Sequence, residues 1–350
     1  MVAMSGGVDS SVSALVLIEK GFQVEGVTMP LSGFMEGRHP GGVDPVEEAR
    51  RVCQVLGIPH HEIQIDPYAQ RCVVDYFVQE YLKGRTPNPC IQCNMLIKFK
   101  ELFKKVRESG AGFFATGHYA RIEDVRGEYQ LKKGTDPEKD QSYFLYGIDP
   151  GILPEVLFPV GGMVKQQVRQ LALSKGLPCA DRKESQDICF IPEGDYKDFL
   201  KQKAGAGAFV PGIFKDHTGK TVGEHQGIGY YTIGQRERLG IALGYPAHVY
   251  RISPDENTIY VGPRECLLSK GFTARNFKSL GMNLQAGAVN VSVKIRYNAP
   301  DVPAKASSST EQGEIRVDFA RPQESVTPGQ SAVFFDGDRV LGGAVIEASF

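Results

Sequence analysis

The amino-acid sequence predicts an α/β domain with a parallel sheet, followed by a smaller β-rich part. Three observations support this fold class. Apolar runs alternate with amphipathic runs of helical length in the first half, which is typical of parallel sheets. After about residue 195 the runs become short and β-type, separated by Gly, Pro and Asn. The length of 350 residues exceeds that of most single domains. We therefore expect three domains, at residues 1–195, 196–264 and 265–350.

The first half contains both element types in alternation. Short apolar runs predict strands at residues 1–4, 22–29, 60–65 and 111–117. Amphipathic runs predict helices at residues 9–21, 44–57 and 99–110. The second of these helices has the clearest ends, because Asp44 suits the N-cap, Pro45 the first turn and Gly57 the C-terminal cap. Strands that alternate with helices in this way are expected to pair in parallel.

The second half predicts short strands. A run of small residues at 203–212 precedes them. The β-type runs lie at residues 229–234, 248–253, 258–262, 289–297, 313–319 and 331–346. The last run contains Asp336 and Gly337, a pair that suits the type I′ turn of a tight hairpin. We expect a small β-rich domain followed by a β-barrel or a β-sandwich.

Composition excludes several classes of protein. Hydrophobic residues make up 41% and charged residues 23%, which is ordinary for a globular protein. No apolar run approaches the roughly 20 residues of a membrane span, and the first residues lack the basic and apolar regions of a signal peptide. Seven scattered cysteines indicate reduced thiols in a cytoplasm. With a net charge of −1, a polyanion would have to be held by local basic patches.

Residues 5–11, SGGVDSS, lie between the first predicted strand and the first predicted helix. Two glycines let the backbone approach a ligand closely, and amide N–H groups at a helix N-terminus attract an anion. Ser5, Ser10 and Ser11 add hydroxyl donors. Asp9 is unusual in an anion site, unless it holds Mg²⁺ or caps the helix. The lysine of a Walker A loop is absent. The motif predicts a phosphate site, and the alternative is a glycine-rich turn before a capped helix.

Cys90 and Cys93 stand three positions apart in TPNPCIQCN. Their spacing fits half a metal site, a redox pair, or a nucleophile with a neighbour. A zinc ribbon would need a second pair at similar spacing, which the sequence lacks. Cys53, Cys72 and Cys179 stand in helix-like or undistinguished contexts, so we interpret them as small buried hydrophobic residues.

The S-G-G-x-D-S motif resembles the PP-loop of the N-type ATP pyrophosphatases. Further blocks resemble the bacterial tRNA-specific 2-thiouridylase family over nearly the whole chain, at residues 84–99, 115–121, 139–145, 184–192, 223–241 and 327–335. Other PP-loop enzymes, such as argininosuccinate synthase, lack these blocks. The resemblance implies an adenine-nucleotide alpha-hydrolase-like (PP-loop) domain, a small β-rich central domain that binds tRNA, and a C-terminal β-barrel.

The resemblance also implies a reaction and its partners. ATP, with Mg²⁺, adenylates O2 of the wobble uridine (position 34) of a tRNA and releases pyrophosphate. A persulfide sulfur then replaces that oxygen. Cys93 matches the family's nucleophile and Cys189 its persulfide carrier, and the disulfide left between them must be reduced. The expected partners are the anticodon arm of tRNA and a sulfur-relay protein fed by a cysteine desulfurase, without a membrane.

Cys90 departs from the family pattern, in which an aspartate stands three residues before the nucleophile. The change removes a carboxylate that would activate the thiol. It also creates a trio of Cys90, Cys93 and Cys189, similar to related tRNA thiolases in which three thiolates hold a [4Fe–4S] cluster with one open iron. Persulfide chemistry, cluster chemistry and an inert Cys90 all stay open at this point.

The resemblance assigns two sets of binding residues. The nucleotide set is Ala3, Met4, Ser5, Gly6, Gly7, Val8, Asp9, Ser10, Met29 and Gly117. The tRNA set is Asn88, Pro89, Cys90, His118, Lys139, Asp140, Gln141, Arg296, Tyr297 and Gln330. Asn88 and Pro89 are expected beside a target base flipped out of its stack. Without the resemblance, Met29 would be a core residue, His118 a histidine satisfied in a turn, and residues 139–141 a solvated turn.

Two rival interpretations make different predictions. A PP-loop ligase or amidotransferase acting on a small metabolite needs neither tRNA-contact motifs nor paired cysteines, and both are present. A non-catalytic RNA-binding or metal-sensing protein predicts a degraded phosphate loop, whereas SGGVDS is intact. Family members carry several more residues before the first strand, so we expect that strand to be shortened here.

Overall fold

The structure is a computed structural model that describes residues 1–30, 44–182, 188–191, 196–285, 287–309 and 313–350. The chain separates into two compact units. The first contains residues 1–73, 90–193 and 338–340, and the second contains residues 74–89, 194–337 and 341–350. Residues 74–89 directly precede the two cysteines of TPNPCIQCN, yet they pack with the second half of the chain. Sequence patterns did not indicate this exchange.

The first unit is built around five parallel strands. The sheet order is β3-β2-β1-β4-β7, and each adjacent pair is parallel. The strands are β1 Val2–Ala3, β2 Gly26–Thr28, β3 His60–Glu62, β4 Phe114–Ala115 and β7 Val156–Leu157. The predicted parallel α/β sheet is therefore confirmed. The strand order reverses between β1 and β4, and ligands of such sheets bind beyond the carboxyl ends of the strands at this reversal.

Helices follow most of these strands. They are α1 Val8–Glu19, α2 Pro45–Leu56, α3 Pro67–Leu82, α4 Pro89–Gln92, the π-helix η2 Cys93–Leu102, α5 Phe103–Glu108 and α6 Lys165–Ser174. The predicted ends of α2 are confirmed. Asp44 accepts a hydrogen bond from the N–H of Val46 at 2.9 Å, and Gly57 ends the helix with a φ of 67°.

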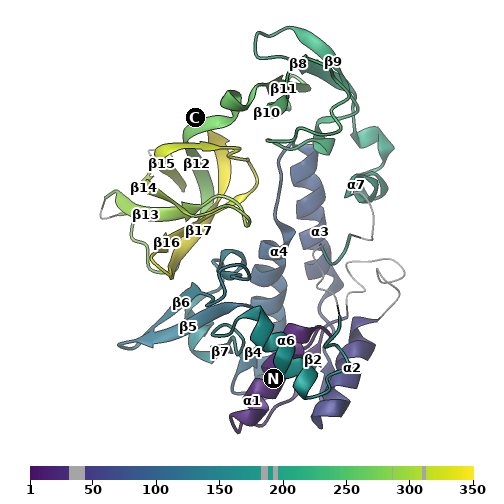
Figure 1. Ribbon diagram of the computed structural model, residues 1–350, viewed down its shortest axis with the longest axis vertical. Helices are drawn as coiled ribbons and strands as arrows, with labels where there is room; N and C mark the ends of the chain where they lie inside the picture. Colours follow the sequence, from purple (N-terminus) through teal and green to yellow (C-terminus); the bar gives the residue numbers. More distant parts are fainter. Residues whose placement is uncertain (31–43, 183–187, 192–195, 286, 310–312) are drawn as a thin grey trace. The chain divides into compact units, whose positions relative to one another are not determined.

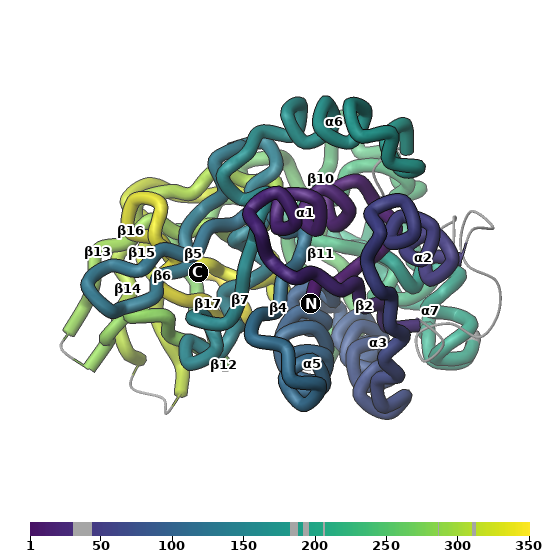
Figure 2. Tube along the Cα trace, turned by 90° about the horizontal axis from the view of Figure 1, so that it is seen from below, coloured from purple at the N-terminus to yellow at the C-terminus, as the bar shows by residue number. Residues whose placement is uncertain are grey.

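Hydrophobic layers cover both faces of the sheet. On one face, α1, α2 and α6 contribute Val12, Val52 and Val168 to a buried cluster. On the other, Phe99 of η2 meets Phe114 of β4 edge to face, with ring centroids 5.9 Å apart. Figure 2 shows α1 and α6 beside each other on one side of the strands and α5 on the other.

The helix predicted at residues 99–110 begins earlier and in an unusual form. α4 runs into η2 and then into α5 without a break. A π-helix of 10 residues is exceptional, because π turns occur mostly as single-turn bulges, often at functional sites. Both cysteines of TPNPCIQCN thus lie at the start of one continuous helix.

Smaller elements complete the first unit. β5 Ala120–Val125 and β6 Glu128–Lys133 form an antiparallel hairpin, and Lys132 of β6 pairs with Arg339 of the C-terminal part of the chain. Two 3-10 helices follow, η3 Ser142–Phe144 and η4 Pro150–Glu155.

The second unit begins with a four-stranded sheet of order β10-β11-β8-β9. Its strands are β8 Gly212–Lys215, β9 Thr221–His225, β10 His248–Ser253 and β11 Thr258–Gly262. Helix α7 Tyr196–Ala204 and the 3-10 turns η5 Ala206–Ala208 and η7 Arg264–Leu267 flank it. The strand expected at residues 229–234 is wrong. That stretch forms the 3-10 helix η6 Ile228–Tyr230, where Tyr230 stacks on Phe209 with centroids 4.3 Å apart.

A closed six-stranded barrel forms the rest of the second unit (Figure 1). Its strands are β12 Leu268–Ser279, β13 Val289–Lys294, β14 Val302–Ser308, β15 Glu314–Glu324, β16 Ser331–Asp336 and β17 Arg339–Ser349. Pairing of β12 with β17 closes the ring, so the barrel is correct and the sandwich is wrong. A type I′ turn needs positive φ at both central residues. Only Gly337 has it here, at 58°, so that turn type is also wrong.

None of the helices within the described ranges is long and apolar enough to cross a membrane.

Candidate functional site

The loop between β1 and α1 has the geometry of an anion site. Gly7 is the N-cap of α1 and has no side chain to occupy the first N–H groups of the helix. At Gly6 φ is 70°, and a Cβ there would lie 2.5 Å from Cβ of Glu48, so only glycine fits. The hydroxyls of Ser10 and Ser11 donate to the Gly7 carbonyl at 3.1 and 2.8 Å. They hold the loop, as do the N–H groups of Ser5 and Gly7, which donate to the hydroxyls of Ser10 and Ser5 at 3.2 and 3.4 Å. The N–H groups of the first turn of α1 are those that suit an anion.

Asp9 is paired within the protein. Its carboxylate accepts from Nζ of Lys165 at 2.7 and 2.8 Å and from the hydroxyl of Tyr119 at 2.7 Å. Lys165 starts α6, and its side chain is 11% exposed against 32% for Asp9. Of the two roles expected for Asp9, capping is wrong, because Gly7 occupies that position.

Of the other residues of the nucleotide set, Gly117 packs against the same loop. Gly117 follows β4, and a Cβ there would lie 2.7 Å from the nitrogen of Ser10 and 2.8 Å from the carbonyl carbon of Asp9. Gly117 thus packs directly on the N-terminal turn of α1, at the reversal of strand order. The remaining members are half-buried or buried, namely Ala3, Met4, Val8 and Met29, while Ser5 is exposed.

Three cysteines come together in the first unit. Cys90 lies in α4, Cys93 begins η2, and Cys189 lies in the short segment 188–191. The charges of Cys90 and Cys93 both raise the pKa of Cys189, so the three thiols lie within electrostatic range of one another. Residues 184–187 and 192 of the matching motif lie outside the described residues.

Burial and a nearby cation act on these thiols in opposite directions. Burial raises the pKa of Cys90 and of Cys93, and it raises the pKa of Cys189 to about 12. Cys90 and Cys189 reach solvent on one side, yet protein surrounds each sulfur on the others and disfavours the thiolate. The positive charge of Lys98 lowers the pKa of all three.

The π-helix explains why Lys98 can act on Cys93. In an α-helix, side chains five positions apart point roughly 140° away from each other. A π-helix bonds residue i to residue i+5, which brings position 98 closer to the side of the helix that carries Cys93 than an α-helix would. The charge of Lys98 acts on Cys93 accordingly.

Asn94, next to Cys93 in the chain, is buried, and His118 is half-buried against Phe99 of the same helix. Burial, and secondarily Lys98, keep the pKa of His118 well below its usual value, so its ring is neutral, and Nδ1 lies 2.7 Å from the hydroxyl of Thr116. Asn94 donates to the carbonyl of Phe144 at 3.1 Å. This bond ties the helix of Cys93 to η3, which directly follows residues 139–141.

The same part of the chain offers few ligands for a metal ion. Within the described ranges, no group of three or more His, Cys, Asp or Glu side chains is gathered closely enough to hold a metal. Cys90, Cys93 and Cys189, as placed, thus do not fit a [4Fe–4S] cluster. Mg²⁺ binds through one or two carboxylates, water and substrate phosphates. Both oxygens of Asp9 are engaged by Lys165, so Asp9 does not fit a resident Mg²⁺ either.

Residues 139–141, expected to contact tRNA, form an ordered loop. Asp140 is buried, and its carboxylate accepts from the N–H groups of Gly134 and Ser142 and from the Ser142 hydroxyl, at 2.9 to 3.0 Å. Gln141 accepts from the N–H of Tyr119 at 3.0 Å. Lys139 is half-buried. In this arrangement Asp140 and Gln141 shape the loop through their own side chains.

Three more residues of the tRNA set, Asn88, Pro89 and Gln330, lie in the second unit and are linked through Thr86. Asn88 and Pro89 end residues 74–89 and are half-buried and buried. Gln330 lies between β15 and β16, and its amide donates to the carbonyl of Thr86 at 2.7 Å. Gln330 is thus joined to the segment that leads to Asn88 and Pro89.

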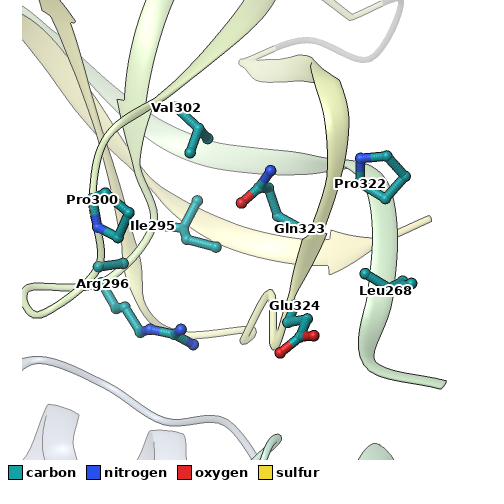
Figure 3. A pocket seen from close by; sticks show the side chains of 9 residues that line it. Leu268, Ile295, Arg296, Pro300, Val302, Pro322, Gln323 and Glu324 are labelled. Atoms are coloured by element: carbon teal, nitrogen blue, oxygen red, sulfur yellow. The ribbon is translucent and has the colours of Figure 1, made fainter. Parts of the chain in front are cut away.

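Arg296 and Tyr297 follow β13 on the barrel. Arg296 is exposed and lines a pocket of about 310 Å³, at whose polar edge Glu324 also lies (Figure 3). Arg264 donates to Glu324 at 2.8 Å, so a second arginine stands next to this edge. Tyr297 is half-buried, with Nζ of Lys294 5.5 Å from its ring centroid.

Two of the three cysteines that we interpreted as small buried hydrophobic residues are indeed buried. Cys53 and Cys179 are both 1% exposed and belong to the core cluster of the first unit. Cys72 is only half-buried.

Sequence reasoning missed Lys165, Tyr119 and Lys98. One signal existed for Lys165, because a lysine in the first turn of a helix opposes the helix dipole and needs an anionic partner. Nothing in the local pattern pointed to Tyr119. Lys98 lies one residue before the helix predicted at residues 99–110, and the pattern gave no sign of a π-helix there.

Family models match three consecutive stretches of the chain. A "tRNA methyl transferase HUP domain" matches residues 1–193, a "tRNA methyl transferase PRC-barrel domain" residues 197–263, and an "Aminomethyltransferase beta-barrel domain" residues 269–346. Two solved structures resemble parts of it, a predicted subunit of tRNA methyltransferase from Methanocaldococcus jannaschii and NMN synthetase from Francisella tularensis. They are 17% and 18% identical, cover 49% and 58% of this chain and 74% and 75% of theirs, and have TM-scores of 0.30 and 0.35, too low to support an argument.

Curated relatives match almost from end to end. The tRNA-specific 2-thiouridylase of Carboxydothermus hydrogenoformans is 44% identical, over 99% of this chain and 97% of its own. That of Geobacter metallireducens is 44% identical, over 100% and 96%. That of Heliobacterium modesticaldum is 42% identical, over 99% and 91%.

Proposed function

The chain belongs to the tRNA-specific 2-thiouridylase family, and from this premise we propose that it is a tRNA-uridine 2-sulfurtransferase. It uses ATP to replace O2 of the wobble uridine (position 34) of tRNA with sulfur. The observation that carries the proposal is the presence of two chemical sites in one unit. A phosphate loop lies at the reversal of strand order, and three thiols of the same unit lie within electrostatic range of one another and of Lys98.

The first step is adenylation. O2 of the uridine attacks the α-phosphorus of ATP, pyrophosphate leaves, and the base oxygen becomes an ester of AMP. The oxygen is then a good leaving group. Backbone N–H groups of the first turn of α1 face the phosphates, and Gly6 and Gly7 let the backbone approach them. Two cations lie at this loop: Lys165, which is paired with Asp9, and Arg182, whose guanidinium donates to the carbonyl of Gly6 at 3.4 Å.

The second step transfers sulfur. Cys189 carries a persulfide, and the thiolate of Cys93 attacks its inner sulfur. A Cys93–Cys189 disulfide forms and hydrosulfide leaves. Hydrosulfide adds to C2 and AMP departs with the oxygen, which leaves a C=S bond. Direct attack of the persulfide on C2 gives the same product after reduction by Cys93. A thiol reductant then restores both cysteines.

The surroundings of Cys93 assist this step. Burial favours the protonated thiol and Lys98 favours the thiolate, so the cation partly replaces the activating aspartate that the family carries at position 90. Neutral His118 packs against Phe99 and Phe158, with ring centroids 5.9 Å apart in both pairs. It excludes water from this side of the helix.

The second candidate chemistry is a cluster, favoured by a cysteine at position 90. As described above, the three thiols do not form a metal-ligating group, so no step is assigned to iron. ATP brings Mg²⁺ on its own phosphates.

Binding and partners follow from the same premise. Asn88 and Pro89 lie beside the flipped base, His118 and residues 139–141 face the RNA side of the catalytic unit, and Arg296 and Tyr297 contact the anticodon arm. Sulfur reaches Cys189 from a relay protein supplied by a cysteine desulfurase. The protein works in the cytoplasm, where its thiols stay reduced.

The names of two matching family models point to methyl transfer instead. Methyl transfer would draw on S-adenosylmethionine, and it gives no role to an ATP phosphate loop or to grouped thiols. One assay separates the two reactions.

The test supplies unmodified tRNA, ATP with Mg²⁺, and a cysteine desulfurase with cysteine, and measures nucleosides, AMP and pyrophosphate. We expect one AMP for each 2-thiouridine. Cys93→Ser and Cys189→Ser should eliminate 2-thiouridine and retain ATP–pyrophosphate exchange, while Cys72→Ser serves as the matched control with normal activity. Full thiolation by Cys189→Ser, or a methylated nucleoside formed without ATP, would reject the proposal.

A further inference from the structure

Residues 84–87, here called the strap, connect the end of α3 to Asn88 and the helix that carries Cys90 and Cys93. The strap belongs to the second unit together with the barrel. It starts at Gly84, whose φ is 68° and whose Cβ, if present, would lie 2.6 Å from Cγ2 of Ile252. A side chain at this position is therefore excluded both by conformation and by space.

Each polar group of Thr86, namely the N–H, the carbonyl and the hydroxyl, has a hydrogen-bond partner. Its N–H donates to the carbonyl of Pro328 at 2.9 Å, and its carbonyl accepts from the amide of Gln330 at 2.7 Å. Its hydroxyl lies 3.1 Å from that of Thr232. Gly329 packs on the strap so closely that a Cβ there would lie 2.8 Å from the nitrogen of Thr86, and its φ is 91°.

Arg85 fixes the strap a second time. Its guanidinium contacts Glu80 and Glu347, at 2.7 Å each, and donates to the carbonyl of Ile346 at 3.1 Å. Its side chain is 19% exposed and that of Glu80 12%, so these are partly buried charge-assisted bonds, stronger than ordinary surface pairs.

The two anchors belong to one network on the barrel. Gly329 donates its N–H to the carbonyl of Ile346, and Ile346 donates its N–H to the carbonyl of Gln330, both at 2.9 Å. Ile346 is part of β17, a barrel strand. The barrel therefore holds the strap through the loop at residues 328–330 and through strand β17, and this loop and strand are hydrogen-bonded to each other.

We propose that Gln330 and Arg85 are positioning residues, which set the location of Cys90 and Cys93 by fixing the strap to the tRNA-binding barrel. The reaction and the RNA partner in this inference rest on the proposed function. Gln330 was expected to contact tRNA, yet its amide is bonded to Thr86. A barrel placed on the anticodon arm would thereby also place the segment that enters the catalytic helix.

The two roles of Gln330 predict different kinetics. A residue that contacts tRNA changes the Kd and KM for tRNA when it is truncated. A residue that positions the nucleophile changes kcat and the accessibility of Cys93 instead. Gln330→Leu removes the donor to Thr86. Gly329→Ala adds a methyl group against the strap and leaves every polar group in place.

Both variants are tested as full chains that melt cooperatively, beside Gln285→Leu, an exposed glutamine of the barrel part, as the control. We expect kcat for 2-thiouridine formation to fall about tenfold. This fall is smaller than the roughly hundredfold loss that follows when a reacting group is displaced by about 1 Å. The Kd for tRNA should stay within about twofold of that of the control. Iodoacetamide should modify Cys93, which is buried, at least about threefold faster, because a released strap exposes it.

An increased Kd for tRNA with unchanged kcat and unchanged alkylation would make Gln330 a tRNA contact and overturn the inference. Unchanged alkylation in both variants would overturn it as well. The alkylation comparison needs no tRNA and no ATP, so it decides on the strap even where the parent chain forms no 2-thiouridine, a result that would reject the proposed function alone. Where Gln330→Leu does not fold, Gln330→Asn replaces it, because its shorter side chain cannot reach Thr86.

Discussion

Replacement of Lys165 by glutamine removes the cation that is paired with Asp9 beside the phosphate loop. Nζ of Lys165 lies 2.7 and 2.8 Å from the two oxygens of Asp9. Glutamine keeps most of the side-chain volume, so the main change is the loss of charge. Asp9 then faces the loop with only the Tyr119 hydroxyl, at 2.7 Å, and the N-terminal dipole of α1 as partners.

The magnitude follows from burial. Removing one partner of a fully buried ion pair costs about 3–5 kcal/mol, whereas an exposed pair contributes about 0–1 kcal/mol. Asp9 is 32% exposed and Lys165 11%, and Asp9 keeps two other stabilising partners. We therefore expect the free energy of unfolding to fall by about 1–2 kcal/mol. Each kcal/mol lost should lower Tm by about 2–4 °C. The uncompensated carboxylate should also repel phosphate and raise the Kd for ATP about tenfold.

The assay is a double-mutant cycle on Lys165→Gln and Asp9→Asn, read by urea unfolding and by ATP binding. The double variant should lose less stability than the sum of the singles, with a coupling energy of about 1 kcal/mol. Lys175→Gln is the matched control, because Lys175 at the other end of the same helix pairs with Glu19 at 2.8 Å but both side chains are nearly half exposed. A coupling energy below about 0.3 kcal/mol together with an unchanged Kd for ATP would refute this account of Lys165.

Three further predictions concern the thiols and the barrel. Cys90→Asp should keep or increase 2-thiouridine formation, since a carboxylate beside Cys93 can take its proton, whereas loss of both iron and activity in protein purified without oxygen would favour a cluster. Alkylation of Cys189 should still rise with pH at pH 10, because burial raises its pKa to about 12, and a plateau below pH 9 would contradict that burial. Arg296→Ala should weaken tRNA binding and reduce the salt slope by about one counterion, and an unchanged slope would remove Arg296 from the interface.

Local sequence patterns predicted the elements whose ends are set by their own residues. α2 begins at Asp44 and ends at Gly57 as expected, because a cap and a left-handed glycine act within a few positions. Helix α3 was missed because it is not amphipathic in the usual way. It buries Gln70 and Val73 in the first unit and Phe77 and Tyr81 in the second, so its apolar residues do not follow one stripe.

Patterns failed where a distant contact decides the conformation. Residues 229–234 have the aromatic and β-branched composition of a strand, yet Gly227 at a φ of 133° and stacking of Tyr230 on Phe209 turn the chain into η6. The π-helix is a second case. Its sequence is that of an ordinary amphipathic helix, and the position of Lys98 relative to Cys93 depends on a helix type that composition does not indicate.

In the candidate site, too, features set by local sequence were predictable, and features set by distant contacts were not. The phosphate loop was predictable, because two glycines and a helix N-terminus create an anion site on their own. The partners of its motif residues were not, since Lys165 is 156 positions from Asp9 and Gln330 is 244 positions from Thr86. Asp9 belongs to a recognisable motif and Lys165 does not, while Thr86 and Gln330 belong to two separate motifs whose contact no local pattern indicates.

A residue within a functional motif can therefore serve the site without touching a substrate. Ser10, Ser11 and Asp140 direct their side chains to backbone groups of their own loops, and Gln330 directs its amide to the strap. Buried polar groups must be paired, so a loop that presents its backbone to RNA or phosphate needs polar side chains on its inner side to hold that shape. Motif positions of this kind will lower kcat when altered, and positions that meet the ligand will raise KM. Measuring kcat and KM separately for variants along SGGVDSS and the strap therefore distinguishes the residues that hold the shape of the site from those that bind a ligand.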